Sequence, residues 1–119
     1  RLWPEDARHL VALLPVAALG RLYLMFPDPW PKARHAKRRF VHPAMLPLVA
    51  RVLRAGGEWR IASDDPTYQA WVEEVFADQP FFALRSVVTE RAADGHPTRY
   101  EAKAIREGRV PSYLTFLRR

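Results

Sequence analysis

Two aspartates, Asp28 and Asp64, each close a short apolar run of the kind that forms a buried strand. Asp28 comes just after RLYLMF (21–26), and Asp64 ends EWRIASD (58–64). If these runs are parallel neighbours in one sheet, both carboxylates lie at the same edge, where open α/β sheets bind their ligands. A shared binding or catalytic site at that edge is therefore the first hypothesis.

Prolines stiffen the loop around Asp28. Pro27, Pro29 and Pro31 fix φ at their own positions and restrict the residues before them, including Asp28. A carboxylate in such a loop loses little entropy when a ligand holds it. A solvated aspartate in a proline-rich loop is the simpler interpretation of an isolated Asp-Pro pair, but the neighbouring Trp30 and the cations beyond it favour a site.

A basic run, KARHAKRR (32–39), follows the loop without an intervening acid. Its cations are Lys32, Arg34, Lys37, Arg38 and Arg39. Arginine grips phosphate through two parallel hydrogen bonds, lysine supplies a point charge, and a nearby tryptophan can stack on a base. The formal net charge of +6 over 119 residues also favours an anionic partner such as nucleic acid. A solvated basic loop is the alternative.

Composition excludes several other kinds of site. The sequence has no cysteine, which rules out disulfides and thiolate metal sites. The four histidines lack the close spacing of zinc ligands, so we expect no metal. The longest apolar run, LVALLPVAAL (10–19), is too short to span a bilayer, and we expect no signal peptide. We expect one soluble, cytoplasmic domain with no membrane partner.

The elements that must position these residues alternate along the chain. Helices are expected at 5–14, 43–54 and 66–78, and strands at 21–26, 58–64, 81–88 and 112–118. This order predicts an α/β fold with a mostly parallel sheet and an antiparallel end formed by the last two strands. Gly56-Gly57 is expected to stop the second helix, and Asp65-Pro66 to begin the third. Residues 91–111 are interpreted as a polar connection.

Three stretches carry a resemblance to a known family. They are FPDPWPKARHAKRR (26–39), RVLRAGGEWRIASD (51–64) and TRYE (98–101). Together, in this order and over nearly the whole chain, they resemble the bacterial tRNA (guanine-N7)-methyltransferases, which use S-adenosylmethionine. The resemblance implies that residues 1–119 are the C-terminal half of a Rossmann-like class I methyltransferase domain, without the N-terminal glycine-rich cofactor motif.

The resemblance also implies roles for the matching residues. Asp28 matches the acidic residue at the junction of cofactor and substrate, which is the implied catalytic group. Asp6 falls where the family has an aspartate near the adenine of the cofactor, although its own context is better explained as an acid at a helix N-terminus. Substrate contacts are implied for Lys32, Asp64, Thr98, Arg99, Tyr100 and Glu101. RNA binding is implied for Arg34, His35, Lys37, Arg38 and Arg39.

The implied activity is methyl transfer from S-adenosylmethionine to guanine N7 in the variable loop of tRNA. Two departures from the family pattern bear on it. Asp65-Pro66 stands where the family usually has a tryptophan, and REGRVPSYLTFLRR (106–119) replaces a glycine-histidine-glycine pattern.

Three alternatives remain open from the residues alone. The first is a non-catalytic, basic RNA-binding α/β module, for which Asp28 is dispensable. The second is an amino-group methyltransferase, whose loop has two prolines between acid and aromatic residue where this chain has one. The third is an α/β interaction domain that does not bind RNA even at low salt.

Overall fold

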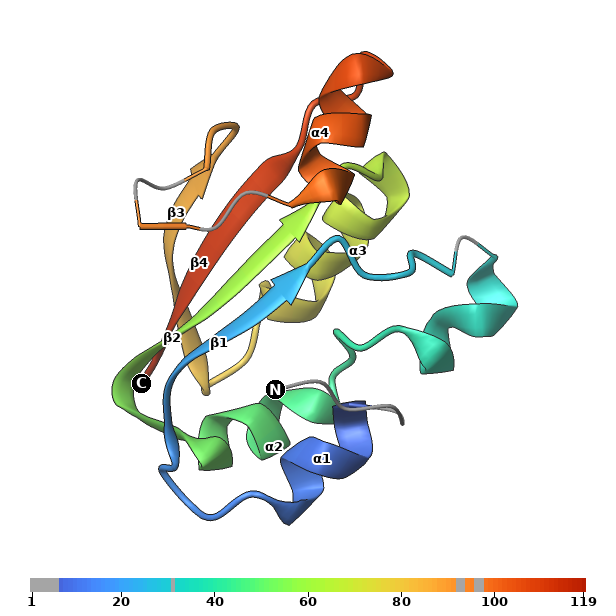
Figure 1. Cartoon of the computed structure of the whole chain (residues 1–119). Coiled ribbons are helices and arrows are strands. Elements are labelled where there is room, and N and C mark those ends of the chain that lie inside the picture. Colours follow the sequence, from blue (N-terminus) through green and yellow to red (C-terminus); the bar gives the residue numbers. More distant parts are fainter. Residues whose placement is uncertain (1–6, 31, 92–93, 96–97) are drawn as a thin grey trace.

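The computed structural model describes residues 7–30, 32–91, 94–95 and 98–119. Its centre is a four-stranded sheet in the order β1-β2-β4-β3 (Figure 1). The strands are β1 (Leu19–Met25), β2 (Leu53–Ser63), β3 (Phe82–Val88) and β4 (Ser112–Arg118). The helices are α1 (Ala7–Leu13), α2 (Met45–Val52), α3 (Pro66–Phe76) and α4 (Arg99–Arg106), with a 3₁₀ helix η1 (Ala33–Arg38). No helix in these ranges is long and apolar enough to cross a membrane.

The strand directions refine the expected sheet. β1 and β2 are parallel, whereas β4 pairs antiparallel with both β2 and β3. Three strands therefore run one way and β4 runs against them. Because β4 lies between β2 and β3, only the β1–β2 pair is parallel, so the expectation of mostly parallel pairing does not hold for these strands. The α/β class and the antiparallel end are confirmed.

The start of β2 differs from the expectation. The second helix ends at Val52, and Leu53 is already extended, with φ −84° and ψ 141°. Gly56-Gly57 thus lies inside β2, in a bulge where Leu19 pairs with Leu53 and Arg21 pairs with Glu58. Gly56 has φ +75°, and a Cβ on Gly57 would lie 2.8 Å from the Arg54 carbonyl oxygen. The glycines therefore shape the strand pairing instead of ending a helix.

Helix α4 replaces part of the connection expected at 91–111. Thr98 is its N-cap, because the Thr98 hydroxyl accepts a hydrogen bond from the Glu101 backbone N–H at 3.1 Å. A threonine followed three residues later by glutamate is a sequence signature of a helix start. The missed helix was therefore signalled in the sequence by TRYE itself.

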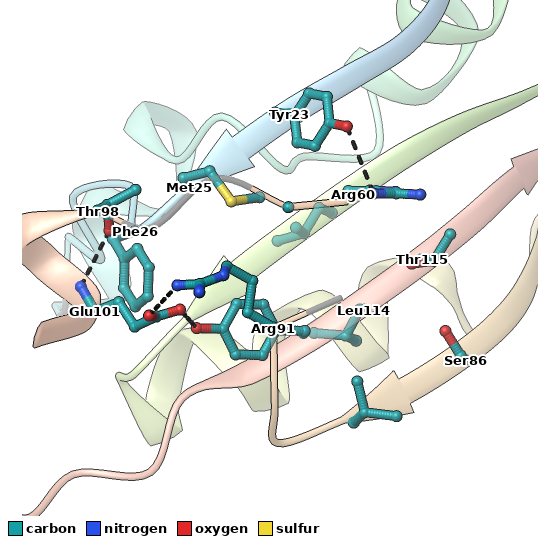
Figure 2. Close-up of a pocket in the computed structure, with 14 residues that line it drawn as sticks. Tyr23, Met25, Phe26, Arg60, Ser86, Arg91, Thr98, Glu101, Leu114 and Thr115 are labelled. Atoms are coloured by element: carbon teal, nitrogen blue, oxygen red, sulfur yellow. Dashed lines mark hydrogen bonds and ion pairs between the residues drawn. The ribbon is translucent and has the colours of Figure 1, made fainter. Parts of the chain in front are cut away.

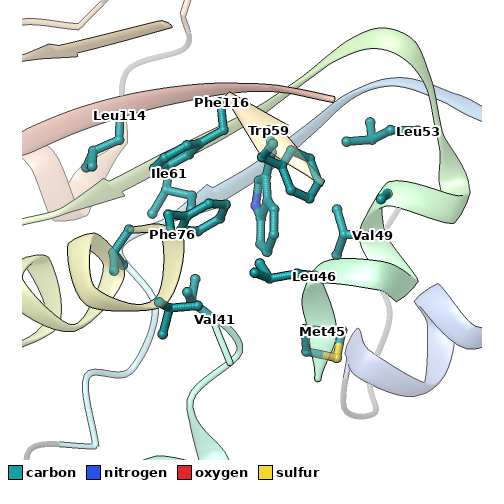
Figure 3. Close-up of a cluster of buried hydrophobic side chains, with 14 of the residues drawn as sticks. Val41, Met45, Leu46, Val49, Leu53, Trp59, Ile61, Phe76, Leu114 and Phe116 are labelled. Atoms are coloured by element: carbon teal, nitrogen blue, oxygen red, sulfur yellow. The ribbon is translucent and has the colours of Figure 1, made fainter. Parts of the chain in front are cut away.

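The core lies between the sheet and helices α1 to α3, with Trp59 of β2 at its centre (Figure 3). The Trp59 ring meets Phe76 of α3 and Phe82 of β3 at centroid distances of 5.4 and 5.6 Å. Phe76 also stacks on Phe116 of β4 at 3.7 Å. Since side chains alternate along a strand, burial of Trp59 and Ile61 turns their neighbour Arg60 towards the opposite face.

Replacing Trp59 with alanine should lower the free energy of unfolding by about 3–5 kcal/mol, because the surrounding aromatic rings cannot close the cavity. Urea denaturation of the full-length protein measures this loss. Leu84→Ala is the control, since Leu84 on β3 is 58% exposed, and its effect should stay within about 0.5 kcal/mol. Equal losses for the two variants would contradict the placement of the core.

Candidate functional site

The two aspartates at the strand ends share one edge of the sheet, as predicted. Met25 at the end of β1 pairs with Ala62 of β2, and the Phe26 N–H donates to the Ala62 carbonyl at 2.7 Å. Because the strands are parallel, Asp28 and Asp64 both follow carboxyl ends. In Figure 1 this edge points towards α4 and the loop leading to η1.

The Asp28 loop has an unusual backbone. Asp28 is exposed, and its Oδ1 accepts a hydrogen bond from the Trp30 N–H at 3.0 Å, which closes a tight turn. Phe26 and Trp30 have φ values of 51° and 42°. Residues with side chains rarely adopt positive φ unless the surroundings impose it. The loop therefore depends on contacts from outside its own proline-rich sequence.

Arg39, for which an RNA contact was expected, supplies such contacts. Its side chain is buried, with only 5% of the residue exposed. Nε donates to the Pro29 carbonyl at 3.2 Å, and Nε and Nη2 donate to the Trp30 carbonyl at 3.2 and 2.9 Å. The guanidinium lies 4.8 Å from the centroid of the Trp71 ring. Arg39 is therefore engaged inside the protein, whereas the RNA contact expected for it requires an exposed cation.

The other cations of the basic run are exposed, whereas its histidine packs against the protein. Lys32, Arg34, Lys37 and Arg38 are exposed along η1, and we call these four the η1 surface. Arg38 lies over the Trp30 ring at 4.9 Å. His35 is half-buried, with its ring edge-on to Trp30 at 5.5 Å. The Trp30 ring is therefore already covered by two members of the run.

The TRYE segment also has one side chain held against the protein and others at the surface. Glu101 accepts a hydrogen bond from Arg91 at 2.6 Å and another from the Tyr113 hydroxyl. Arg99 and Tyr100 instead pair with each other at the surface, Nη2 to hydroxyl at 3.2 Å, and Arg99 lowers the pKa of the Tyr100 phenol. Burial, followed by the bond to Glu101, raises the pKa of Tyr113. Glu101 is thus held against the sheet, while Arg99 and Tyr100 face outward.

A cavity of about 340 Å³ lies between α4 and the face of the sheet opposite the core (Figure 2). Residues that line it include Tyr23, Phe26, Arg60, Thr98, Glu101 and Tyr113. Phe26 meets Tyr113 edge-on at 6.5 Å, so this cavity adjoins the start of the Asp28 loop. Neither Asp28 nor Asp64 lines it.

Asp64 is engaged by a residue that the sequence interpretation missed. Its Oδ2 accepts a hydrogen bond from Nε of Arg109 at 2.5 Å, and 21% of its side chain is exposed. The next residue, Asp65, caps α3 by accepting from the Tyr68 N–H at 2.8 Å, as predicted from Asp65-Pro66. Asp6 lies outside the described residues.

Arg91, Arg109 and Tyr113 had no recognisable sequence signal. Arg109 and Tyr113 fall in the C-terminal stretch that departs from the family pattern, and Arg91 falls in the expected connection. Each becomes part of the site only through a contact with a residue distant in sequence or in another element. Among the residues described here, no group of three or more His, Cys, Asp or Glu side chains could hold a metal ion.

Asp94 fastens the segment before α4 to the sheet. Its two oxygens accept from Arg60 Nη1 at 2.9 Å and from Arg21 Nη1 at 3.1 Å. Glu58 completes the network by accepting from Arg60 Nε at 2.8 Å. The hydrogen bond from Arg60 is the main reason why the pKa of Asp94 lies below its ordinary value. These ties hold α4 and Glu101 over the cavity.

The fold is that of a methyltransferase-like α/β domain. A protein of Thermus thermophilus described as a "Putative DNA Modification Methylase", solved in complex with S-adenosyl-L-methionine, superposes with a TM-score of 0.52 at 17% identity. The match covers 96% of this chain and 51% of that one.

A family model described as "Putative methyltransferase" matches residues 1–113, and the chain belongs to this family. It is 61% identical to the tRNA (guanine-N(7)-)-methyltransferase of Granulibacter bethesdensis, over 100% of this chain and 52% of that protein. It is 50% identical to the protein of the same name from Rhodospirillum rubrum, over 100% of this chain and 48% of that protein. The chain thus spans about half the length of the curated relatives it matches.

Asp94→Asn should destabilise the protein at neutral pH, and this effect should fade on acidification. The folded-state pKa of Asp94 is depressed, so its ion pairs stabilise the fold above the unfolded pKa of about 3.9 and lose this effect as the pH falls through the folded value. Urea midpoints of wild type and variant at pH 7 and pH 3 give the comparison. Asp78→Asn, just beyond α3, is the control. A difference as large at pH 3 as at pH 7 would count against the network.

Proposed function

We propose that the protein transfers a methyl group from S-adenosylmethionine to guanine N7 in the variable loop of tRNA. The observation that carries this proposal is the position of Asp28, whose Oδ1 accepts a hydrogen bond from the Trp30 N–H, at the carboxyl edge of two parallel strands and beside the exposed η1 surface. The names of relatives 61% and 50% identical to this chain support it. Since tRNA is the proposed substrate, we also propose that the protein acts in the cytoplasm.

The residues that the structure describes suit the charged sulfur end of S-adenosylmethionine. S-adenosylmethionine supplies an electrophilic methyl group on a positively charged sulfur, and the exposed Asp28 carboxylate suits that charge. No glycine-rich turn that could cradle the rest of the cofactor occurs in residues 1–119, whose five glycines are scattered apart from the Gly56-Gly57 bulge. We therefore propose that residues 1–119 are part of a methyltransferase domain and that the cradle comes from outside them.

The proposed reaction needs no strong acid or base. Guanine N7 carries an in-plane lone pair, so the protein has only to align the base with the methyl group and to stabilise the charge that develops on the purine. Asp28 is placed for this second task because its Oδ1 is oriented by the Trp30 N–H. Its loop geometry is set before a ligand arrives, which reduces the entropy lost on binding.

Recognition of guanine is proposed for Asp64 and the TRYE segment. A carboxylate can accept hydrogen bonds from guanine N1–H and the amino group, and it has about four lone-pair sites for doing so. Asp64 uses Oδ2 for Arg109, and Glu101 is held by Arg91 and Tyr113. Each carboxylate is thus fixed by a neighbouring donor while it retains capacity for a base, and Lys32 is exposed to meet guanine O6.

Binding of the RNA backbone is proposed for the η1 surface. Its four cations are exposed, and lysine and arginine contacts to phosphate supply affinity without reading sequence. His35 lies beneath this surface against Trp30, so we propose that it supports Trp30 and contacts RNA only at its exposed edge. The same cations would also serve a non-catalytic RNA-binding module. The role of Asp28 distinguishes methyl transfer from that alternative, because the RNA-binding module does not need this carboxylate.

Asp28→Asn should lower methyl transfer to tRNA guanine by about 10²- to 10³-fold, the loss typical when one preorganised electrostatic group is removed from an active site. Methyl transfer from labelled S-adenosylmethionine by the full-length protein measures this change. Affinity for tRNA should stay close to that of wild type because the η1 surface is untouched. Unimpaired transfer by the variant would favour the non-catalytic RNA-binding module.

Neutralising the η1 surface one cation at a time should flatten the salt dependence of tRNA binding. Arg34→Gln, Lys37→Gln and Arg38→Gln should each reduce the slope of log affinity against log salt by roughly 0.7 to 0.9, one released counterion each. Arg85→Gln, on β3 with a side chain 59% exposed, is a control with the same change of charge and should leave the slope unchanged. Slopes that do not move in any η1 variant would show that this surface is merely solvated.

A further inference from the structure

We infer that Arg39 is a positioning residue for the Asp28 loop and that Trp71 of α3 holds Arg39 in place. Arg39 acts through the backbone of Pro29 and Trp30, not through contact with the substrate. This inference rests on the proposed function for its kinetic consequence, while its structural consequence can be measured without any enzymatic activity.

The geometry of the guanidinium carries the argument. The carbonyl groups of two consecutive residues, Pro29 and Trp30, converge on one side of Arg39 and accept from its Nε and Nη2 at 2.9–3.2 Å. A planar fork of fixed donors can hold two such oxygens at once, whereas a lysine ammonium is a single point. The Asp28 carboxylate accepts a hydrogen bond from the Trp30 N–H, so holding the Trp30 backbone in place also orients the carboxylate.

Helix α3 supplies the rigid backing. The Arg39 guanidinium packs on the Trp71 ring, and Trp71 Nε1 donates to the Val41 carbonyl at 2.6 Å. One turn earlier on α3, the buried Tyr68 hydroxyl accepts from the Val41 N–H at 3.3 Å. Burial raises the pKa of Tyr68 to about 12, so this hydroxyl keeps its proton at neutral pH. Both backbone groups of Val41 are therefore held by one helix, which places Arg39 beneath the loop.

The loop needs this support because its backbone is strained. Phe26 and Trp30 both have positive φ, a conformation that persists only when contacts around it over-determine it. Loss of the Arg39 fork allows Trp30 to relax, and Asp28 moves with it. A displacement of about 1 Å in an aligned active site can lower the rate about 100-fold.

Lysine substitutions at a buried and at an exposed arginine separate positioning from charge. Arg39→Lys keeps the positive charge but loses the fork, and Arg85→Lys makes the same change on β3, where the side chain is 59% exposed. In the full-length protein, Arg39→Lys should lower kcat for tRNA methylation by at least about 10-fold, with KM for tRNA and the salt slope of binding within about twofold of wild type. Arg85→Lys should change kcat by less than about twofold.

Trp71→Leu should reproduce the kinetic effect of Arg39→Lys. Because both side chains act on the same turn, the double variant should lose less activity than the product of the two single losses. Strict multiplication of the losses would overturn the shared role.

Trypsin cleavage supplies a readout that needs no catalysis. Lys32 and Arg34 lie just beyond the held turn, and cleavage after them should be about 10-fold faster in Arg39→Lys, because cleavage follows the population of locally opened protein. Arg51→Gln is the matched control, since Arg51 also donates to two carbonyls, those of Val11 and Ala12, at 3.2 and 3.3 Å. It should lower Tm without changing kcat or cleavage after Lys32 and Arg34.

The outcomes distinguish this inference from the proposed function. If wild type transfers no methyl group to guanine, the proposed function fails, but faster cleavage in Arg39→Lys still supports the positioning role. Unchanged kcat and cleavage in Arg39→Lys overturn the inference. A reduced salt slope in Arg39→Gln overturns it too, because Arg39 would then be an RNA contact. The inference is also overturned if Arg51→Gln and Arg39→Lys have the same Tm and lose the same amount of kcat. The loss of kcat would then come from lower global stability.

Discussion

The parallel pairing of β1 with β2 is the constraint on which the site depends. It brings residues 28 and 64, far apart in the chain, to one edge of the sheet, and the Phe26 N–H extends the pairing beyond the last residue of β1. The bulge at Gly56-Gly57 sets the register, because Gly57 lies too close to the backbone at Arg54 and Gly20 for any side chain. A slip of one residue would turn Trp59 out of the core and Arg60 into it.

The second determinant is the insertion of β4 between β2 and β3. This order lets the chain return along the sheet and brings Tyr113 of β4 next to Phe26 at the start of the Asp28 loop. The preceding segment and α4 then lie over the face opposite the core, where Asp94 ties them to Arg60 and Arg21. The TRYE segment thus reaches the Asp28 loop through packing on β4.

Several arginines hold parts of the structure together, so the net charge overstates the positive charge that is free at the surface. Arg39 holds the Asp28 loop, Arg60 holds the segment before α4, and Arg109 holds Asp64. The exposed positive charge beside the Asp28 loop is that of the η1 surface, and the buried Arg39 does not add to it. The number of cations in a sequence overstates the number that can contact phosphate, because guanidinium groups also satisfy buried carbonyls.

The sequence by itself determined the α/β class, the approximate positions of four strands and three helices, and the edge shared by Asp28 and Asp64. These follow from local patterns of apolar residues, prolines and caps, which act over a few residues. The start of α4 was also encoded locally, in the Thr98 cap, but was not recognised. Only the tertiary structure decided that Arg38 is exposed and Arg39 buried, because that difference depends on Trp71, which α3 brings from a distant part of the chain beneath one arginine and not its neighbour.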